Sequence, residues 1–180
     1  MHDVLTLIID RMDTPIGELL LVTDNAARLR AVDWADHEFR MRRLLGLHYG
    51  RDRFELEPAH SPHSVRNRME RYFAGHVDVL SDIPVETAGT PFQRTVWNEL
   101  RRIPCGAAIS YRQLAERIGR AKATRAVGLA NGANPIGIVV PCHRVIGSDG
   151  SLTGYGGGVE RKRWLLEHER QYAVPRDSRN

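Results

Sequence analysis

The residues best suited to chemistry in this chain are Cys142 and His143, which are neighbours in the stretch Val139–Val145, Val-Val-Pro-Cys-His-Arg-Val. A thiol acts as a nucleophile when a lowered pKa or a nearby base makes it a thiolate, and an imidazole is such a base. Adjacent side chains on extended backbone diverge, so we expect the two groups to communicate through a water molecule or across a sharp turn. A buried structural cysteine is the ordinary alternative for an isolated thiol.

The segment in front of the thiol predicts how it is held. The apolar run Ile136–Val140 indicates a buried segment, and Pro141 ends any strand pairing because proline has no N–H to give a ladder. Asn134-Pro135 predicts a turn before that segment. The sequence therefore predicts that Cys142 stands at the end of a buried segment rather than on an open loop.

A glycine-rich loop follows at Leu152–Gly158, Leu-Thr-Gly-Tyr-Gly-Gly-Gly. It is not a phosphate loop, because no Gly-Lys-Ser/Thr follows it. Glycines around one tyrosine favour close approach of the backbone to a flat ligand, with Tyr155 available as a lid, although a flexible hairpin tip has the same composition. A last helix is predicted at about 159–171, with Trp164, Leu165 and His168 toward the core and Glu169 near its end.

Two capping boxes predict helix starts in the middle of the chain. Thr90-Pro91-Phe92-Gln93 begins a helix that runs to about Arg102, and Ser110-Tyr111-Arg112-Gln113 begins one at 111–118. A second short helix at 123–130 completes a helix-turn-helix pattern, which occurs in DNA-binding proteins and also as ordinary packing. That helix is almost bare, with Arg125 as its one long projection. Small side chains such as Ala126 and Gly128 suit close approach either to a nucleic-acid backbone or to a neighbouring helix. Cys105, between Pro104 and Gly106, has no partner group nearby in sequence and is interpreted as incidental.

The first 89 residues predict a small α+β unit without a cluster of chemical groups. Thr14-Pro15-Ile16-Gly17 predicts a hairpin turn, and residues 76–89 a linker that includes a strand at Val77–Leu80. His60 and His63 have no cysteine or third ligand beside them and are interpreted as loop histidines. The predicted elements are strands at 4–9, 18–22, 29–34 and 54–57 and helices at 37–48 and 63–74.

Composition sets limits on the class of protein. The chain has 180 residues, enough for one large or two small domains, and only two cysteines, which indicates a reducing, cytoplasmic environment rather than a disulfide framework. No apolar run reaches the ~20 residues of a membrane helix, and the N-terminus lacks a signal peptide. The net charge of +4 is uneven, since residues 1–89 carry −4 and residues 90–180 carry +8. A basic half favours a polyanionic partner, most often nucleic acid, over a merely solvated surface.

Several of these stretches resemble the O6-alkylguanine-DNA alkyltransferases, also called methylated-DNA–protein-cysteine methyltransferases. The resemblance is close over about residues 90–170 and looser before them. It lies in Pro141–Val145, Asn134-Pro135, Ser110–Gly128 and Gly154–Gly158, and more weakly in Thr14–Gly17, Leu29–Trp34 and Tyr72–Gly75.

The resemblance implies direct repair of DNA. O6-alkylguanine, and in some relatives O4-alkylthymine, would be flipped from duplex DNA, and its alkyl group would pass to Cys142 in one step that consumes the protein without a cofactor. The fold implied is α+β: a ribonuclease-H-like N-terminal domain at 1–80, a linker at 81–89, a mostly helical domain with a helix-turn-helix at 90–174, and a flexible tail at 175–180. We expect minor-groove binding by a monomer, with cooperativity along DNA left open. Some members hold zinc in their N-terminal half, but this half has no cysteine, so no metal site is expected.

The resemblance also implies roles for individual residues. His143 would act as base through a water and Glu169 would orient it, although from the residues alone Glu169 is one of several carboxylates. Asn134 would brace the active-site turn. The substrate would meet the Tyr111 hydroxyl, the Gly156 N–H, the carbonyls of Cys142 and Val145, and Tyr155. Arg125 would fill the gap left by the flipped base, and Ala126 and Gly128 would lie against the DNA.

Two other classes of protein remain as alternatives. A non-catalytic binder of alkylated DNA is the first, but relatives of that kind place tryptophan where this chain has Cys142. A Cys-His hydrolase is the second, and it needs an oxyanion hole and usually a base distant in sequence, for which no motif is present.

Overall fold

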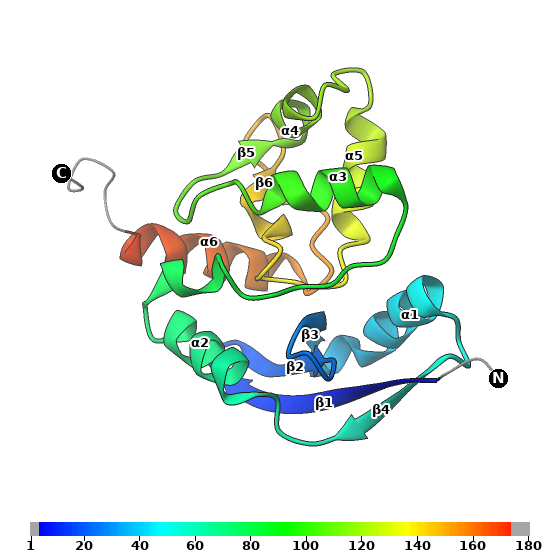
Figure 1. The fold of residues 1–180 in the computed structure, drawn as a ribbon. Coiled ribbons are helices and arrows are strands. Elements are labelled where there is room, and N and C mark those ends of the chain that lie inside the picture. Colours follow the sequence, from blue (N-terminus) through cyan, green and yellow to red (C-terminus); the bar gives the residue numbers. More distant parts are fainter. Residues whose placement is uncertain (1–3, 174–180) are drawn as a thin grey trace.

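The computed structural model describes residues 4–173. The predicted tail at 175–180, and the last residue of the predicted domain at 90–174, lie outside the described residues. The fold mixes helices and sheets, and Figure 1 shows a sheet-containing part below and a mostly helical part above. Within residues 4–173 no helix is both long and apolar enough to cross a membrane.

The lower part is built on a four-stranded sheet of order β3-β2-β1-β4. The hairpin predicted at Thr14–Gly17 is confirmed, because β1 and β2 pair antiparallel up to the Thr14–Gly17 pair. β3 continues the antiparallel order, whereas β4 pairs parallel to β1. The first strand is longer than predicted, since it continues past Ile9 to Thr14. The strands are β1 (Leu5–Thr14), β2 (Gly17–Thr23), β3 (Leu29–Trp34) and β4 (Phe54–Pro58).

Both faces of this sheet are buried, because successive side chains of a strand point to opposite faces. Leu20 and Val22 of β2 pack with α1 (Glu38–Tyr49), which follows the 3₁₀ turn η1 (Ala35–His37). Leu19 and Leu21 point the other way, into a larger core that includes α2 (His63–Phe73). The apolar run of β2 is therefore the middle of a three-layer packing.

The segment after α2 corrects one prediction. Val77–Leu80 forms a 3₁₀ turn, η2, and not a strand. Its two buried side chains, Val77 and Leu80, are three residues apart, which places them on one side of a turn with three residues per revolution. Apolar alternation in four residues was too short to separate a strand from such a turn. The chain then returns to the sheet, where Val85 bridges Leu29.

The upper part contains the helices that the capping boxes predicted. α3 (Pro91–Leu100) and α4 (Tyr111–Arg117) each begin with a complete capping box, at Thr90 and Ser110. α5 (Thr124–Gly132) continues two residues beyond the predicted end, so Asn131 is helical and buried. The remaining elements are β5 (Ile109–Ser110), the 3₁₀ turn η3 (Cys142–Arg144), β6 (Val145–Ile146), which pairs parallel to β5, and α6 (Val159–Tyr172).

One hydrophobic core crosses both parts. It runs from Leu21 of β2 through Trp97 of α3 to Leu165 of α6. Backbone contacts join the same parts, since Val32 of β3 bridges Ile136 in the segment before Cys142. In Figure 1 α6 lies between the sheet below and the helices above. The sheet therefore supports the segment that carries the thiol.

A core shared by the two parts predicts a single unfolding transition. Leu21→Ala in the sheet and Leu165→Ala in α6 should each lower the free energy of unfolding by about 2–5 kcal/mol. Both should lower one common midpoint, measured by circular dichroism and by fluorescence of Trp34 and Trp97. Leu129→Ala removes the same atoms from a side chain that is 72% exposed and should leave the midpoint unchanged. Two separated transitions, only one of which responds to Leu21→Ala, would contradict the shared core.

Candidate active site

The segment before Cys142 is held by an asparagine. The Asn134 Nδ2 amide donates to the carbonyl oxygen of Val140 at 2.7 Å, and its Oδ1 accepts from the N–H of Ile136 at 3.0 Å. The backbone N–H of Gly137 donates to the carbonyl oxygen of Val32 in β3. The segment is buried as predicted, but it is a closed turn rather than a strand. Asn134 thus stands where a brace for the cysteine-bearing turn is needed.

Ile138 in this segment has a left-handed backbone with φ of +69°. A β-branched residue rarely adopts that conformation, which costs of order 1–3 kcal/mol and persists only when surrounding contacts enforce it. Ile138 is buried, and the hydrogen bonds of Asn134 close the turn around it. The segment that leads into Cys142 therefore holds a strained backbone conformation at Ile138.

Cys142 itself begins the η3 turn, so Cys142 and His143 lie on a tight turn and not on extended backbone. The thiol is buried in a small pocket lined by Asn131, Tyr155 and Arg40, among others. Burial raises the pKa of the Cys142 thiol, while the Asn134 amide and the charges of Arg40 and Lys162 oppose that rise. The resting cysteine is therefore a thiol, which must lose its proton before or as it reacts.

His143, the residue after Cys142, forms a buried pair with Glu169. The Nε2 atom of His143 lies 2.8 Å from Oε1 of Glu169, and both side chains are completely buried. A carboxylate only accepts hydrogen bonds, so Nε2 carries the proton and Nδ1 is left as an acceptor. Within residues 4–173, Nδ1 has no hydrogen-bond partner. The ring thus offers a free basic nitrogen one residue away from Cys142.

Glu169 accepts from three side chains. Arg144 reaches it with Nε at 2.8 Å and Nη2 at 2.9 Å, and the Tyr72 hydroxyl donates to Oε1 at 2.8 Å. Burial alone would raise the pKa of the Glu169 carboxyl, but the charges and hydrogen bonds of His143 and Arg144 hold it well below its ordinary value. The carboxylate is therefore charged at neutral pH.

The imidazole has the opposite balance. Burial lowers the pKa of His143; Glu169 partly opposes this, and the positive charges of Arg144 and Lys162 reinforce it. Burial disfavours the charged form of any group that has left water. The resting site consequently contains a neutral thiol and a neutral imidazole, not a thiolate–imidazolium ion pair.

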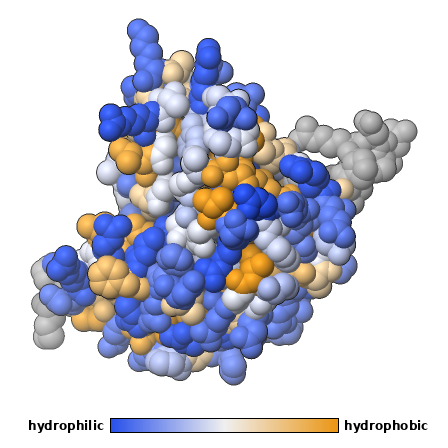
Figure 2. Space-filling view, turned by 180° about the vertical axis from the view of Figure 1, so that it is seen from behind, coloured by the Kyte–Doolittle hydropathy of each residue, from blue (hydrophilic) through white to orange (hydrophobic). Residues whose placement is uncertain are grey.

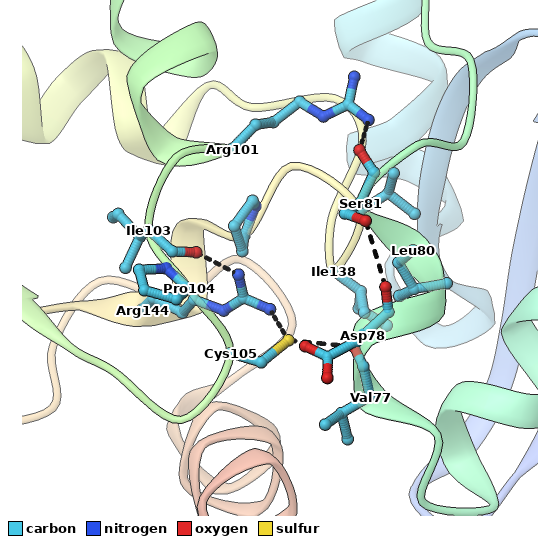
Figure 3. A pocket seen from close by; sticks show the side chains of 12 residues that line it. Val77, Asp78, Leu80, Ser81, Arg101, Ile103, Pro104, Cys105, Ile138 and Arg144 are labelled. Carbon is cyan, nitrogen blue, oxygen red and sulfur yellow. Dashed lines mark hydrogen bonds between the residues drawn. The ribbon is translucent and has the colours of Figure 1, made fainter. Parts of the chain in front are cut away.

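Cys105 corrects a second prediction, because it is part of this network. Figure 3 shows the Arg144 guanidinium between the carbonyl oxygen of Ile103 and the sulfur of Cys105, which faces the carbonyl oxygen of Val77. The Arg144 Nη2 atom lies 2.8 Å from Sγ. Burial raises the pKa of the Cys105 thiol to about 11, so this cysteine is no rival nucleophile. A cavity of about 450 Å³ lies beside the group.

A second cluster borders the pocket from the glycine-rich loop. The Tyr111 hydroxyl donates to the carbonyl oxygen of Thr153 at 3.1 Å, and the Nζ of Lys162 donates to the same oxygen at 3.0 Å. Lys162 is completely buried, and its Nζ lies 5.8 Å from the centroid of the Tyr111 ring. Burial lowers the pKa of Lys162, and Cys142 partly opposes that shift. Tyr111, predicted to touch substrate, thus has a cation beside it, and its hydroxyl lies near Gly154, which lines the pocket.

The glycines of the loop accommodate side chains of the N-terminal half. A Cβ on Gly156 would lie 2.2 Å from the Arg40 guanidinium, and one on Gly157 would lie 2.4 Å from the Trp34 ring. No larger residue fits at either position without a shift. Tyr155 is half-buried between them and lines the same pocket as Cys142. The glycines that predicted close approach to a flat ligand therefore also make room for Arg40 and Trp34 of the same chain.

The predicted DNA-contacting residues lie on α5. Arg125 and Ala126 are exposed, and Gly128 is half-buried with its Cα facing the Tyr111 ring. α4 packs against α5, and the segment from Tyr111 to Gly132 has five basic residues and one acidic one. Figure 2 shows long hydrophilic side chains projecting from the top of the molecule, where Figure 1 places these helices. The exposed basic residues there are Arg112, Arg117, Arg120, Lys122 and Arg125.

Sequence reasoning missed four contributors to the site. Lys162 was recoverable, because it stands on the buried face of α6 with Leu165, Leu166 and Glu169 at helical spacing. Arg40 gave no signal in an arginine-rich chain, yet its Nη2 pairs with the buried Asp33 at 2.9 Å. The other two, Tyr72 and Arg144, reach Glu169 through tertiary contacts alone. Within residues 4–173 no group of three or more potential metal ligands lies together.

Removing Arg144 should lower the free energy of unfolding, because the buried Glu169 carboxylate loses its main charged partner. Arg144→Met keeps much of the volume but leaves Glu169 with two donors, and breaking a buried pair costs about 3–5 kcal/mol of stability at pH 7. The low folded-state pKa of Glu169 stabilises the wild type above the ordinary pKa of 4.5, and this gain is lost as pH falls toward the folded-state pKa. The difference between the two proteins should therefore shrink below about pH 4.5.

Urea unfolding at pH 7 and at pH 4 measures that difference. Arg112→Met is the matched control, because it removes a guanidinium from an exposed pair with Glu116 and should change stability little. An equal loss for both variants, or a loss that does not depend on pH, would argue against a stabilising role of Arg144 at Glu169.

Known proteins are similar to this chain over most of its length. The model of the 6-O-methylguanine DNA methyltransferase DNA-binding domain matches residues 91–171. Methylated-DNA–protein-cysteine methyltransferases from Shigella flexneri and Salmonella typhimurium are 51% and 52% identical, each over 92% of this chain and 96% of the relative. The Mycobacterium tuberculosis OGT crystallised with DNA superimposes with a TM-score of 0.75 at 40% identity, over 94% of this chain and 96% of that one. With its buried cysteine, histidine and glutamate in place, the chain belongs to the methylated-DNA–protein-cysteine methyltransferases.

Proposed function

We propose that this protein repairs DNA by moving an alkyl group from O6 of a flipped guanine in duplex DNA to the sulfur of Cys142, once per molecule. The observation that carries the proposal is the buried Cys142 thiol next to a completely buried His143–Glu169 pair. The proposal extends to O4-alkylthymine as a second substrate class of the same chemistry. The relatives from Shigella flexneri and Salmonella typhimurium are named for the same class of reaction.

The proposed step transfers one carbon between oxygen and sulfur. The Cys142 Sγ forms a bond to the alkyl carbon while the bond from that carbon to O6 breaks. The thiol proton passes through a water to Nδ1 of His143, which has no protein partner within residues 4–173. Glu169 stabilises the imidazolium that forms, and the electron pair of the broken bond leaves on the base, which takes up a proton to become guanine. Nothing removes the thioether, so each protein reacts once.

A neutral resting pair suits this reaction. A permanent thiolate would react with other electrophiles, whereas a buried thiol becomes nucleophilic only when the base and a water complete the relay. The leaving guanine gains negative charge, so donors at its N3 and O6 lower the barrier. We assign these to the Tyr111 hydroxyl and the Gly156 N–H. The carbonyls of Cys142 and Val145 would accept from the exocyclic amine, and Tyr155 would cover the base.

The pocket must open before a base can enter. Its free volume is about 10 Å³, enough for about one water and far below that of a purine. The groups that fill it are Tyr155 and Gly156 of the loop and Arg40, which packs on Gly156. We infer that the glycine-rich loop moves away from Arg40 when the base arrives.

The basic surface of α4 and α5 is the proposed DNA interface. We infer that the two helices act as a helix-turn-helix that enters the minor groove, because the small side chains of α5 allow the DNA backbone to approach closely. Arg125 would occupy the gap left by the flipped base. Flipping costs a few kcal/mol and less for an alkylated, mispaired base, which favours the lesion. The Mycobacterium tuberculosis relative was crystallised with DNA, which supports DNA binding as such.

We further propose the organisation expected from the sequence. The 3-2-1-4 sheet with one parallel edge strand supports a ribonuclease-H-like N-terminal domain at 1–80, joined by residues 81–89 to a DNA-binding and alkyl-accepting domain from residue 90. A monomer acting in the cytoplasm, with no cofactor or metal, remains part of the proposal.

The reaction is tested by the mass of the protein after one turnover. Mixed with a duplex containing one O6-methylguanine, the wild type should gain one methyl group, on the peptide that holds Cys142. Cys142→Ala should gain none, and Cys105→Ala should still gain one, because the Cys105 thiol has a raised pKa and contacts Arg144 instead. No mass gain by the wild type while the DNA stays bound would make the protein a lesion binder.

Base flipping is tested by Arg125. Arg125→Ala should slow transfer from duplex DNA by about tenfold or more, since the flipped state loses the group that fills its gap. Its reaction with a free O6-alkylguanine base should change by less than about twofold. Arg120→Ala removes an equally exposed charge from the turn before α5 and should affect duplex repair mainly through salt-dependent affinity. Equal losses with duplex and free base would count against flipping.

A further inference from the structure

Tyr72 connects the N-terminal half of the chain to the catalytic pair. It is the second-last residue of α2, completely buried, and its hydroxyl donates to Oε1 of Glu169 at 2.8 Å. The same oxygen lies 2.8 Å from Nε2 of His143. Within residues 4–173, it is the only hydrogen bond that joins the first 89 residues to the His143–Glu169 pair.

An aromatic interface between α2 and α6 sets the position of that hydroxyl. The Tyr72 ring meets the His168 ring edge to face at 5.4 Å, and Trp164 stacks on His168 at 4.5 Å. The carbonyl oxygen of Tyr72 also lies 2.7 Å from Nε2 of His168. Phe73 packs on Trp164 with ring centres 5.9 Å apart. Because α6 also carries Glu169, the interface that docks α2 fixes the distance between Tyr72 and the carboxylate.

We propose that Tyr72 is a positioning residue for the alkyl transfer: its hydroxyl holds Glu169 in place and limits the charge that Oε1 presents to His143. The inference rests on the proposed function and adds to it. It gives the N-terminal half a chemical role besides supporting the active-site segment. Tyr72 touches neither the thiol nor the base, and it acts only through Glu169.

The charged and titratable groups around the His143–Glu169 pair determine how the Tyr72 hydroxyl affects the protonation of His143. His143 faces Glu169 and Lys162 of α6 and is followed in η3 by Arg144; Glu169 faces His143, Arg144 and Tyr72. Cys105 lies on the far side of Arg144. Of these, Arg144 and Lys162 disfavour the imidazolium and Glu169 favours it. A donor on Oε1 spreads the negative charge of the carboxylate, so Tyr72 shifts this balance toward neutral imidazole.

Removing the hydroxyl has a predictable sign. In Tyr72→Phe the Oε1 atom keeps only His143 and Arg144 and becomes a stronger acceptor for His143. The imidazolium is then favoured, so the pKa of His143 should rise, by roughly half to one unit. As pH falls, the imidazole is then protonated at a higher pH than in the wild type. The midpoint of the acid limb of the transfer rate should therefore move to higher pH by the same amount. On the acid limb, at a pH below both midpoints, the single-turnover rate should fall about three- to tenfold, with unchanged affinity for DNA.

Two measurements test the role of Tyr72, and only one of them depends on methyl transfer. The first is the single-turnover methyl-transfer rate from an O6-methylguanine duplex between pH 5 and 9. The second is an NMR titration of His143, assigned by the signal that His143→Gln removes. Tyr72→Phe should shift both midpoints upward. In the Glu169→Gln background the same substitution should shift the His143 midpoint by little, because the carboxylate that connects the two groups is gone.

Tyr49→Phe is the matched control. The Tyr49 hydroxyl accepts from Arg30 and donates to the carbonyl oxygen of Glu86, so its loss removes the same atom from the N-terminal half but away from Glu169. It should lower stability without moving either midpoint. Midpoints that stay at wild-type values in Tyr72→Phe would overturn the inference and leave Tyr72 as a packing residue. If the wild type transfers no methyl but the His143 midpoint still rises in Tyr72→Phe, the proposed function fails and the coupling stands.

Discussion

The structure depends on keeping one carboxylate charged in the interior. Glu169 is completely buried, and an ionised carboxylate leaves water at a large cost unless donors surround it. Arg144 supplies two hydrogen bonds, and His143 and Tyr72 supply one each. These donors come from α2 and η3, whereas Glu169 lies on α6, so satisfying one charge requires three distant segments to meet. The fold around the thiol follows from that requirement.

The same burial explains the protonation of the site. Cys142 and His143 both left water, and burial disfavours thiolate and imidazolium alike. Arg144 compensates much of the charge of Glu169, so the carboxylate orients the imidazole without forcing a proton onto it. A neutral imidazole and a protonated thiol suit the proposed single reaction, because an early reaction with another electrophile would consume the molecule.

The N-terminal half takes part in this arrangement at several points. β3 supports the segment before Cys142 by backbone hydrogen bonds, and Arg40 and Trp34 pack where the loop has only glycine. Tyr72 reaches the carboxylate itself. A half without a chemical motif of its own therefore shapes the pocket, the loop and the buried His143–Glu169 pair, since the core that buries them is continuous through both parts.

Local features of this chain were readable from the sequence alone. The capping boxes at Thr90 and Ser110, the hairpin at Thr14–Gly17 and the adjacent Cys142 and His143 depend on residues within a few positions of one another, where short-range rules act. The 3₁₀ turn at Val77–Leu80 and the last two residues of α5 were missed, because packing decides such short segments. Only the tertiary structure decided which carboxylate serves His143 and that Arg144, Tyr72, Cys105 and Arg40 surround the site. Tyr72 lies 97 positions before Glu169. No periodicity or spacing rule reaches that far, and contacts of this kind exist only once burial has brought the segments together.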